Sequence, residues 1–184
     1  WILPGLLVVL ATQTLGLAPS STIWAVWLVS VGVILWLTIM AEYQLVSPSS
    51  KSYRLARLWQ QFVGFGIALA LFVIIYRTRS RSALSATGIV LVSGMVALAL
   101  LRQQPGTIAK IWLFAAVIGL SLGQITWALN YWQASTQDVG LLLLLIFYVL
   151  VGLTRQHFLG RLSHRTIWEF GAVAVLALVM IVSF

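Results

Sequence analysis

The residues best suited to chemistry lie in one polar stretch between two long apolar runs, from Tyr148 to Gly171. Both histidines of the chain, His157 and His164, occur there, and Glu169 follows the second histidine by five residues. Imidazole and carboxylate groups that meet in space can bind a metal ion or transfer a proton. On a helix, however, residues three or four apart share a face, so a spacing of five separates His164 from Glu169. Because no HExxH pattern is present either, we predict no metal site and no cofactor.

The basic residues of the same stretch indicate another role. In chain order the group consists of Arg155, His157, Arg161, His164 and Arg165. Basic side chains beside apolar runs orient membrane proteins and attract anionic lipid headgroups. We therefore expect this group to anchor the chain in the headgroup layer, with membrane lipids as its partners. The net charge of +8 does not indicate nucleic acid as a partner, because the basic residues occur in short clusters beside apolar runs.

Among the polar residues predicted within membrane helices or at their ends, the candidates for a functional role are Glu42, Gln124, Asn130 and Glu169. A polar group at membrane depth is costly, so it usually faces the interior of a bundle and has a partner there. Glu42 and Glu169 also lie within about two turns of a predicted helix end, where water and basic side chains can reach a carboxylate. Two interpretations stay open: an intramembrane polar set, or carboxylates at the membrane boundary.

The elements that must position these residues are membrane-spanning helices. Of the 184 residues, 61% are hydrophobic and only 8% are charged, and the mean hydropathy is +1.05. A soluble core of this size could not bury so much apolar surface, whereas helices of about 20 apolar residues cross a hydrocarbon layer about 30 Å thick. We predict an all-α fold, a polytopic membrane helix bundle that forms a single transmembrane domain over residues 1–184. The seven predicted transmembrane helices cover about residues 1–18, 23–46, 58–76, 82–101, 108–132, 139–158 and 166–184.

The distribution of Lys and Arg predicts the orientation of these helices. Connections between helices two and three, four and five, and six and seven share one side of the membrane and hold eight basic residues, against three on the other side. Loops rich in Lys and Arg face the cytoplasm, so we expect the N-terminus inside, in a bacterial cytoplasmic membrane. The eight are Lys51, Arg54, Arg57, Arg102, Lys110, Arg155, Arg161 and Arg165; the three are Arg77, Arg79 and Arg81.

An internal similarity suggests two copies of a three-helix unit. Trp24 and Tyr43 bracket the second helix at the same separation as Trp112 and Tyr131 bracket the fifth. The segments SRSALSATGIVLVSGMV and SHRTIWEFGAVAVLALV also align. An odd number of helices per copy would invert one copy in the membrane, as in many secondary transporters. Apolar segments also align by chance, so the inverted repeat and a chance similarity both stay open.

Three stretches, SALSATGIVLVSGMVALALL, ITWALNYW and YVLVGLTRQHFLGRL, resemble uncharacterised multi-pass membrane proteins of bacteria that are grouped only as domains of unknown function. The resemblance implies a membrane protein and no particular activity.

Three functions follow as alternatives. The scarcity of polar residues in the predicted helices favours a non-enzymatic module that packs with other membrane proteins or lipids. Gly119 and Gly123 fit this role, because their GxxxG spacing lets two membrane helices approach closely. A small secondary transporter or carrier, with its polar residues at the interface of the repeat, is the second alternative. A lipid-active membrane enzyme, using the two histidines and Glu169, is the third, and we do not favour an enzyme.

Overall fold

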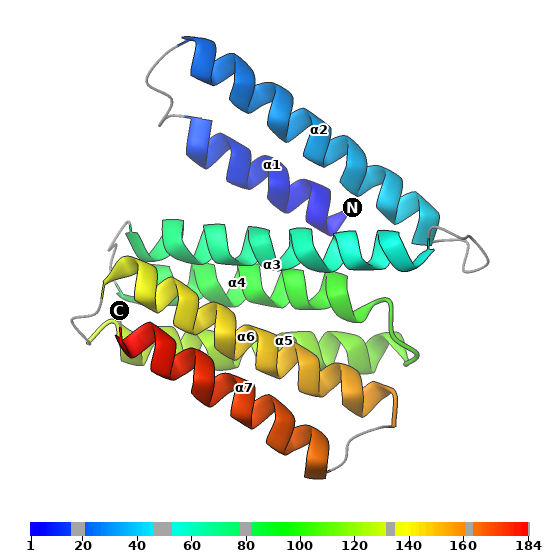
Figure 1. Cartoon of the computed structure of the whole chain (residues 1–184), viewed down its shortest axis with the longest axis vertical. Helices are drawn as coiled ribbons and strands as arrows, with labels where there is room; N and C mark the ends of the chain where they lie inside the picture. Colours follow the sequence, from blue (N-terminus) through cyan, green and yellow to red (C-terminus); the bar gives the residue numbers. More distant parts are fainter. Residues whose placement is uncertain (16–20, 46–52, 78–81, 132–134, 161–163, 184) are drawn as a thin grey trace. The chain divides into compact units, whose positions relative to one another are not determined.

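The computed structural model describes every residue except 16–20, 46–52, 78–81, 132–134, 161–163 and 184 (Figure 1). The described residues form seven α-helices and contain no strand, which confirms the predicted all-α fold. The helices are α1 (Ile2–Leu15), α2 (Ser21–Leu45), α3 (Tyr53–Arg77), α4 (Ser82–Leu101), α5 (Ile108–Leu129), α6 (Thr136–Phe158) and α7 (His164–Ser183).

Five of the described helices are long and apolar enough to cross a membrane, which is consistent with a membrane protein. The five spans are Thr22–Leu45, Tyr53–Arg77, Ala83–Leu101, Ile108–Leu129 and Thr136–Phe158, and α1 is a shorter apolar helix. Helices α2 and α3 contain 25 residues each and therefore extend about 37 Å at a rise of about 1.5 Å per residue. This length exceeds the hydrocarbon thickness of about 30 Å.

Several helix ends differ from the sequence prediction, and three of the differences have a local reason. Helix α3 begins at Tyr53 instead of 58, because Arg, Leu and Ala in the segment YRLAR all favour a helix. Helix α6 begins at Thr136, since Ser135 accepts a hydrogen bond from the backbone nitrogen of Asp138 at 3.2 Å and caps the first turn. Helix α5 ends at Leu129, so Asn130 is its C-cap and not a residue of the helix interior.

The chain divides into two compact units, residues 1–67 and 68–184, with the boundary inside α3. The predicted single transmembrane domain stays a prediction. The inverted repeat is not confirmed, and the boundary of the two units does not coincide with a boundary between the second to fourth and the fifth to seventh helices.

In the first unit, α1 packs against α2. The buried side chains of α1 are Leu3, Leu6 and Leu7, and those of α2 are Thr38 and Ala41. Most of α2 is exposed. Only 6% of its most apolar 18-residue window is buried.

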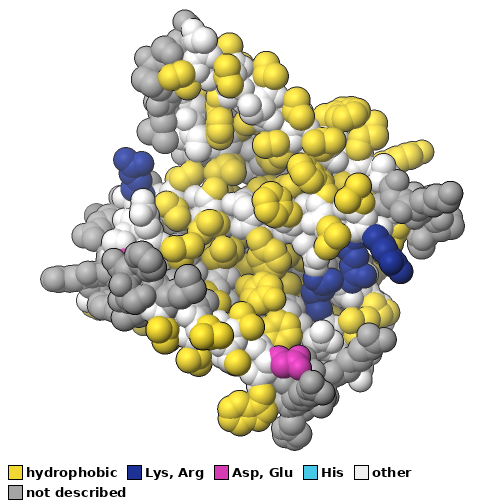
Figure 2. All heavy atoms as spheres, viewed as in Figure 1, with side chains coloured by type: hydrophobic (Ala, Val, Ile, Leu, Met, Phe, Trp, Pro, Cys, Tyr) yellow, Lys and Arg dark blue, Asp and Glu magenta, His cyan; other side chains and the backbone are white. Residues whose placement is uncertain are grey.

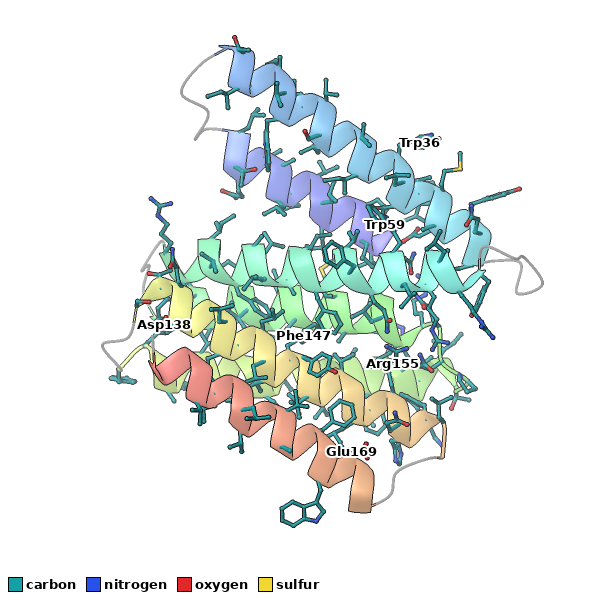
Figure 3. All side chains as sticks on the ribbon, in the orientation of Figure 1. Trp36, Trp59, Asp138, Phe147, Arg155 and Glu169 are labelled. Atoms are coloured by element: carbon teal, nitrogen blue, oxygen red, sulfur yellow. The ribbon has the colours of Figure 1, made fainter. Side chains whose placement is uncertain are left out.

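In the second unit, α4 packs most extensively against α5, and α6 packs against α4, α5 and α7. The second half of α3 joins this core through Phe72, whose ring meets the ring of Phe147 edge to face with centroids 6.0 Å apart. Phe147 lies on α6, and both rings are fully buried (Figure 3).

The contact between α4 and α5 depends on the predicted GxxxG motif. A Cβ atom on Gly119 would lie 2.8 Å from the carbonyl oxygen of Val90 and 3.3 Å from the Cα atom of Gly94. A Cβ atom on Gly123 would overlap the side chain of Val90. The two helices approach so closely because hydrogen is the only side chain that fits at these positions.

Candidate functional site

The basic stretch starts in the last turn of α6, which the structure describes as far as Gly160. The backbone nitrogens of Leu159 and Gly160 donate to the carbonyls of Arg155 and His157 at 3.1 and 3.0 Å. Gly160 has a φ of +64°, the left-handed conformation in which glycine commonly ends helices. Basic side chains in this turn also interact favourably with the negative end of the helix dipole. Local sequence therefore explains why the helix ends here and why its end is basic.

Aromatic contacts bring the end of α6 to the connection between α4 and α5. The ring of Phe114 lies 5.4 Å from the imidazole of His157 and 5.3 Å from the ring of Phe158, measured between centroids. A Cβ atom on Gly106 would lie 3.0 Å from Phe158, so the turn between α4 and α5 also contacts this ring. These contacts put the end of α4, the start of α5 and the end of α6 at one end of the second unit.

We call this region the basic end; its described basic residues are Arg102, Lys110, Arg155 and His157. Arg102, Lys110 and His157 are exposed, and Arg155 is half-buried. Arg155 is labelled in Figure 3. Of the other predicted anchor residues, Arg161 lies outside the described residues. His164 and Arg165 begin α7, but the described part of the structure does not include their side chains.

The opposite end of the second unit contains a polar junction formed by Tyr76, Ser85, Leu129 and Asn130. The Oη atom of Tyr76 donates to the carbonyl oxygen of Leu129 at 3.1 Å. The Nδ2 atom of Asn130 donates to the Oγ atom of Ser85 at 3.2 Å. Tyr76 and Ser85 are buried, with 5% and 2% of their surface exposed. The junction connects the end of α3, the start of α4 and the end of α5.

The four predicted intramembrane residues occupy different environments. Glu42 lies on α2, where 25% of its side chain is exposed. Asn130 belongs to the polar junction, and Gln124 and Glu169 are exposed on α5 and α7. Among the described residues, no group of three or more His, Asp or Glu side chains gathers in a way that could hold a metal ion.

A family model matches the chain, and its match covers residues 1–184. The chain belongs to the family DUF5656. The description of this family is "Protein of unknown function (DUF5656)", which confirms the predicted membership of a family of unknown function. No curated protein and no solved structure matches the chain.

Sequence reasoning missed Tyr76 and Ser85 in this DUF5656 chain. A tyrosine at the end of an apolar run is typical of the membrane interface, and a serine near the start of an apolar helix is typical of helix packing. A signal was nonetheless present. Both residues lie at helix ends that flank the connection between the third and fourth helices, at the same end of the second unit as Asn130. Polar residues at neighbouring helix ends are candidates for one cluster.

Proposed function

We propose that this chain is a multi-pass integral membrane protein that acts as a non-enzymatic module, packing with lipids and with other membrane proteins. The observation that carries the proposal is the exposure of α2. Large apolar side chains are exposed along its whole length; they are Ile23, Trp24, Val26, Leu28, Val29, Val33, Ile34, Trp36, Met40 and Tyr43. Hydrophobic side chains cover much of the visible face of the molecule (Figure 2).

These side chains project from nearly all sides of α2. Trp24 and Val33 are 44% and 52% exposed, and their spacing of nine residues corresponds to about two and a half turns, so they project from opposite sides. Trp36, which is 58% exposed, lies on the side of α2 away from α1 (Figure 3). Exposing apolar surface to water costs roughly 25 cal/mol of free energy per Å². Lipid chains and apolar helices carry no such penalty, so this surface is suited to a membrane.

The proposed orientation follows from charge. Within the second unit, the basic end carries Arg102, Lys110 and Arg155, and the described part of the opposite end carries Arg77 and Asp138. Together with the Lys and Arg bias of the connections, this difference supports a basic end in the cytoplasm and an N-terminus inside. In the proposal the membrane is the cytoplasmic membrane of a bacterium, and anionic headgroups contact the basic end.

Single cysteines can test the topology, because the chain contains no native cysteine. Thr107 and Gln137 are both exposed, and each lies beside a helix start at one end of the second unit. We expect a membrane-impermeant maleimide to label Gln137→Cys on intact cells and Thr107→Cys only after permeabilisation. Equal labelling of both variants on intact cells contradicts the multi-pass topology. Release of the chain from membranes by alkaline carbonate contradicts membrane integration.

The two alternatives from the sequence stay hypotheses. A small transporter or carrier requires Glu42 and Asn130 to line one cavity. A lipid-active enzyme requires His157 and His164 in one pocket, and the side chain of His164 lies outside the described residues.

A further inference from the structure

Within the second unit, helix α5 exposes one of its sides, and a regular row of side chains runs along that side, beside the exposed Trp112. We call this row the α5 seam; it consists of Leu113, Val117, Leu120, Gln124 and Trp127. The exposed fractions of its apolar members are 62%, 49%, 56% and 57% in chain order, and Gln124 is also exposed. The buried side of the same helix, with Ile111, Ala115, Ile118 and Leu122, already packs inside the second unit.

The spacing of the α5 seam is that of a helix–helix contact. Successive members are four, three, four and three residues apart. At about 100° per residue, all five side chains fall within an arc of about 80°. Alternate spacings of three and four characterise the seam of a left-handed helix pair, which is also the commonest packing geometry of transmembrane helices.

Gln124 gives the α5 seam a polar amide, and lipid chains offer no hydrogen-bond partner for it. This residue precedes the last residue of the 22-residue helix α5 by five positions, so it lies about 8 Å from the helix end and inside the hydrocarbon when α5 spans the membrane. A primary amide offers two donors and one acceptor. Among the described residues of the chain, none forms a hydrogen bond with this amide. An amide without hydrogen-bond partners in hydrocarbon is strongly unfavourable. The Gln124 amide therefore needs a polar partner at this depth, from outside the described residues of the chain.

We propose that the α5 seam is a dimer interface between two copies of this chain. The two α5 helices run parallel about a two-fold axis along the membrane normal, and the two Gln124 amides hydrogen-bond to each other. A second copy fits because an amide is both donor and acceptor and is therefore complementary to itself. Symmetry also brings the second amide to the same depth without further adjustment. The other members of the seam are apolar, so they contain no charge that would select a different partner.

The polar residue also has a structural consequence for the dimer. One polar side chain in an otherwise apolar seam fixes the register and orientation of the two helices, because every shifted arrangement leaves an amide unpaired. Lys110 continues the row toward the membrane boundary, where its long side chain can reach water. The parallel arrangement therefore does not bring two ammonium groups into the hydrocarbon.

Disulfide cross-linking of the full chain in native membranes tests the interface. The seam variant is Leu120→Cys, and its matched control is Leu91→Cys on α4, since these leucines are 56% and 60% exposed. After oxidation with copper phenanthroline, we expect a covalent dimer of Leu120→Cys and none of Leu91→Cys. Adding Gln124→Leu to the seam variant should reduce cross-linking by about threefold to tenfold, the effect of losing one interhelical hydrogen bond in a membrane. The leucine occupies an exposed position, so it does not disturb the buried side of α5.

Four results overturn the proposal. The first is the absence of any cross-link, as a monomeric or lipid-covered seam would give, and the second is equal cross-linking of both cysteine variants. The third is a cross-link that Gln124→Leu leaves unchanged, and the fourth is a Leu120→Cys adduct with a different protein in place of the dimer. The inference rests on the proposed membrane insertion of α5, and the two can fail separately. Maleimide labelling at Thr107 and Gln137 reports topology whether or not the seam forms a dimer.

Discussion

The hydroxyl of Tyr76 donates a hydrogen bond to the backbone carbonyl of Leu129, 3.1 Å away, and so connects the end of α3 to the end of α5. The last carbonyls of a helix have no partner within that helix, and a tyrosine from another helix supplies one here. Asn130 and Ser85 add a second hydrogen bond at the same junction.

Replacing Tyr76 with Phe should destabilise the second unit by about 0.5–1.5 kcal/mol, the usual net contribution of one hydrogen bond. Tyr131→Phe is the matched control, because Tyr131 is 80% exposed and lies two residues after Leu129. Unfolding in mixed detergent micelles measures both free energies. Equal stability of Tyr76→Phe and the wild-type chain would show that the hydroxyl contributes nothing.

Replacing Gly119 with Ala should separate α4 from α5. The new Cβ atom would lie 2.8 Å from the backbone oxygen of Val90, and relieving such overpacking typically costs about 1–3 kcal/mol. Gly32→Ala in α2 is the control, because a Cβ atom there meets no other atom within 4 Å. Alanine favours a helix over glycine by about 0.5–1 kcal/mol, so the two variants should shift the thermal midpoint in opposite directions. A shift in the same direction would contradict the close contact.

Replacing Ser135 with Ala should remove the N-cap of α6 and lower stability by about 1 kcal/mol. The hydroxyl of Ser135 also donates to the carboxylate of Asp138 at 2.6 Å, so the two residues satisfy each other. Thr107→Ala is the control, because Thr107 is the N-cap of α5 and its side chain forms no capping hydrogen bond. Amide exchange in the first turn of each helix should accelerate for Ser135→Ala alone. Comparable acceleration in both helices would argue against a specific cap.

Replacing Arg102 and Lys110 together with Gln should weaken the binding of anionic lipid at the basic end by about fivefold per charge. Native mass spectrometry with dioleoylphosphatidylglycerol measures this binding, and dioleoylphosphatidylcholine is the neutral comparison. Arg77→Gln, which removes one exposed charge at the opposite end of the second unit, should leave the binding nearly unchanged. If Arg77→Gln weakens the binding of anionic lipid as much per removed charge as the double variant does, then anionic lipid does not prefer the basic end.

The helices of this protein could be predicted because their signal is local. Five of the described helices have the length and composition of a membrane span, and a backbone without water must form its hydrogen bonds within the helix. The close approach at Gly119 and Gly123 was also predictable, since four-residue spacing puts both glycines on one face of α5. The starts of α6 at Thr136 and of α3 at Tyr53 were harder to predict, because polar and basic residues such as those found there are typical of loops.

The sequence by itself determined the all-α fold, the number of helices and the packing motif of α5. Only the tertiary structure decided which polar residues have partners. Thr126 and Gln124 lie two residues apart on α5, yet the hydroxyl of Thr126 is buried and donates to the carbonyl of Leu122, while Gln124 is exposed. Asn130 likewise meets a serine 45 residues earlier in the chain. The physical reason is that burial depends on which side of α5 packs against α4 and α6, and helical periodicity alone does not distinguish a side that packs within the chain from one that stays exposed.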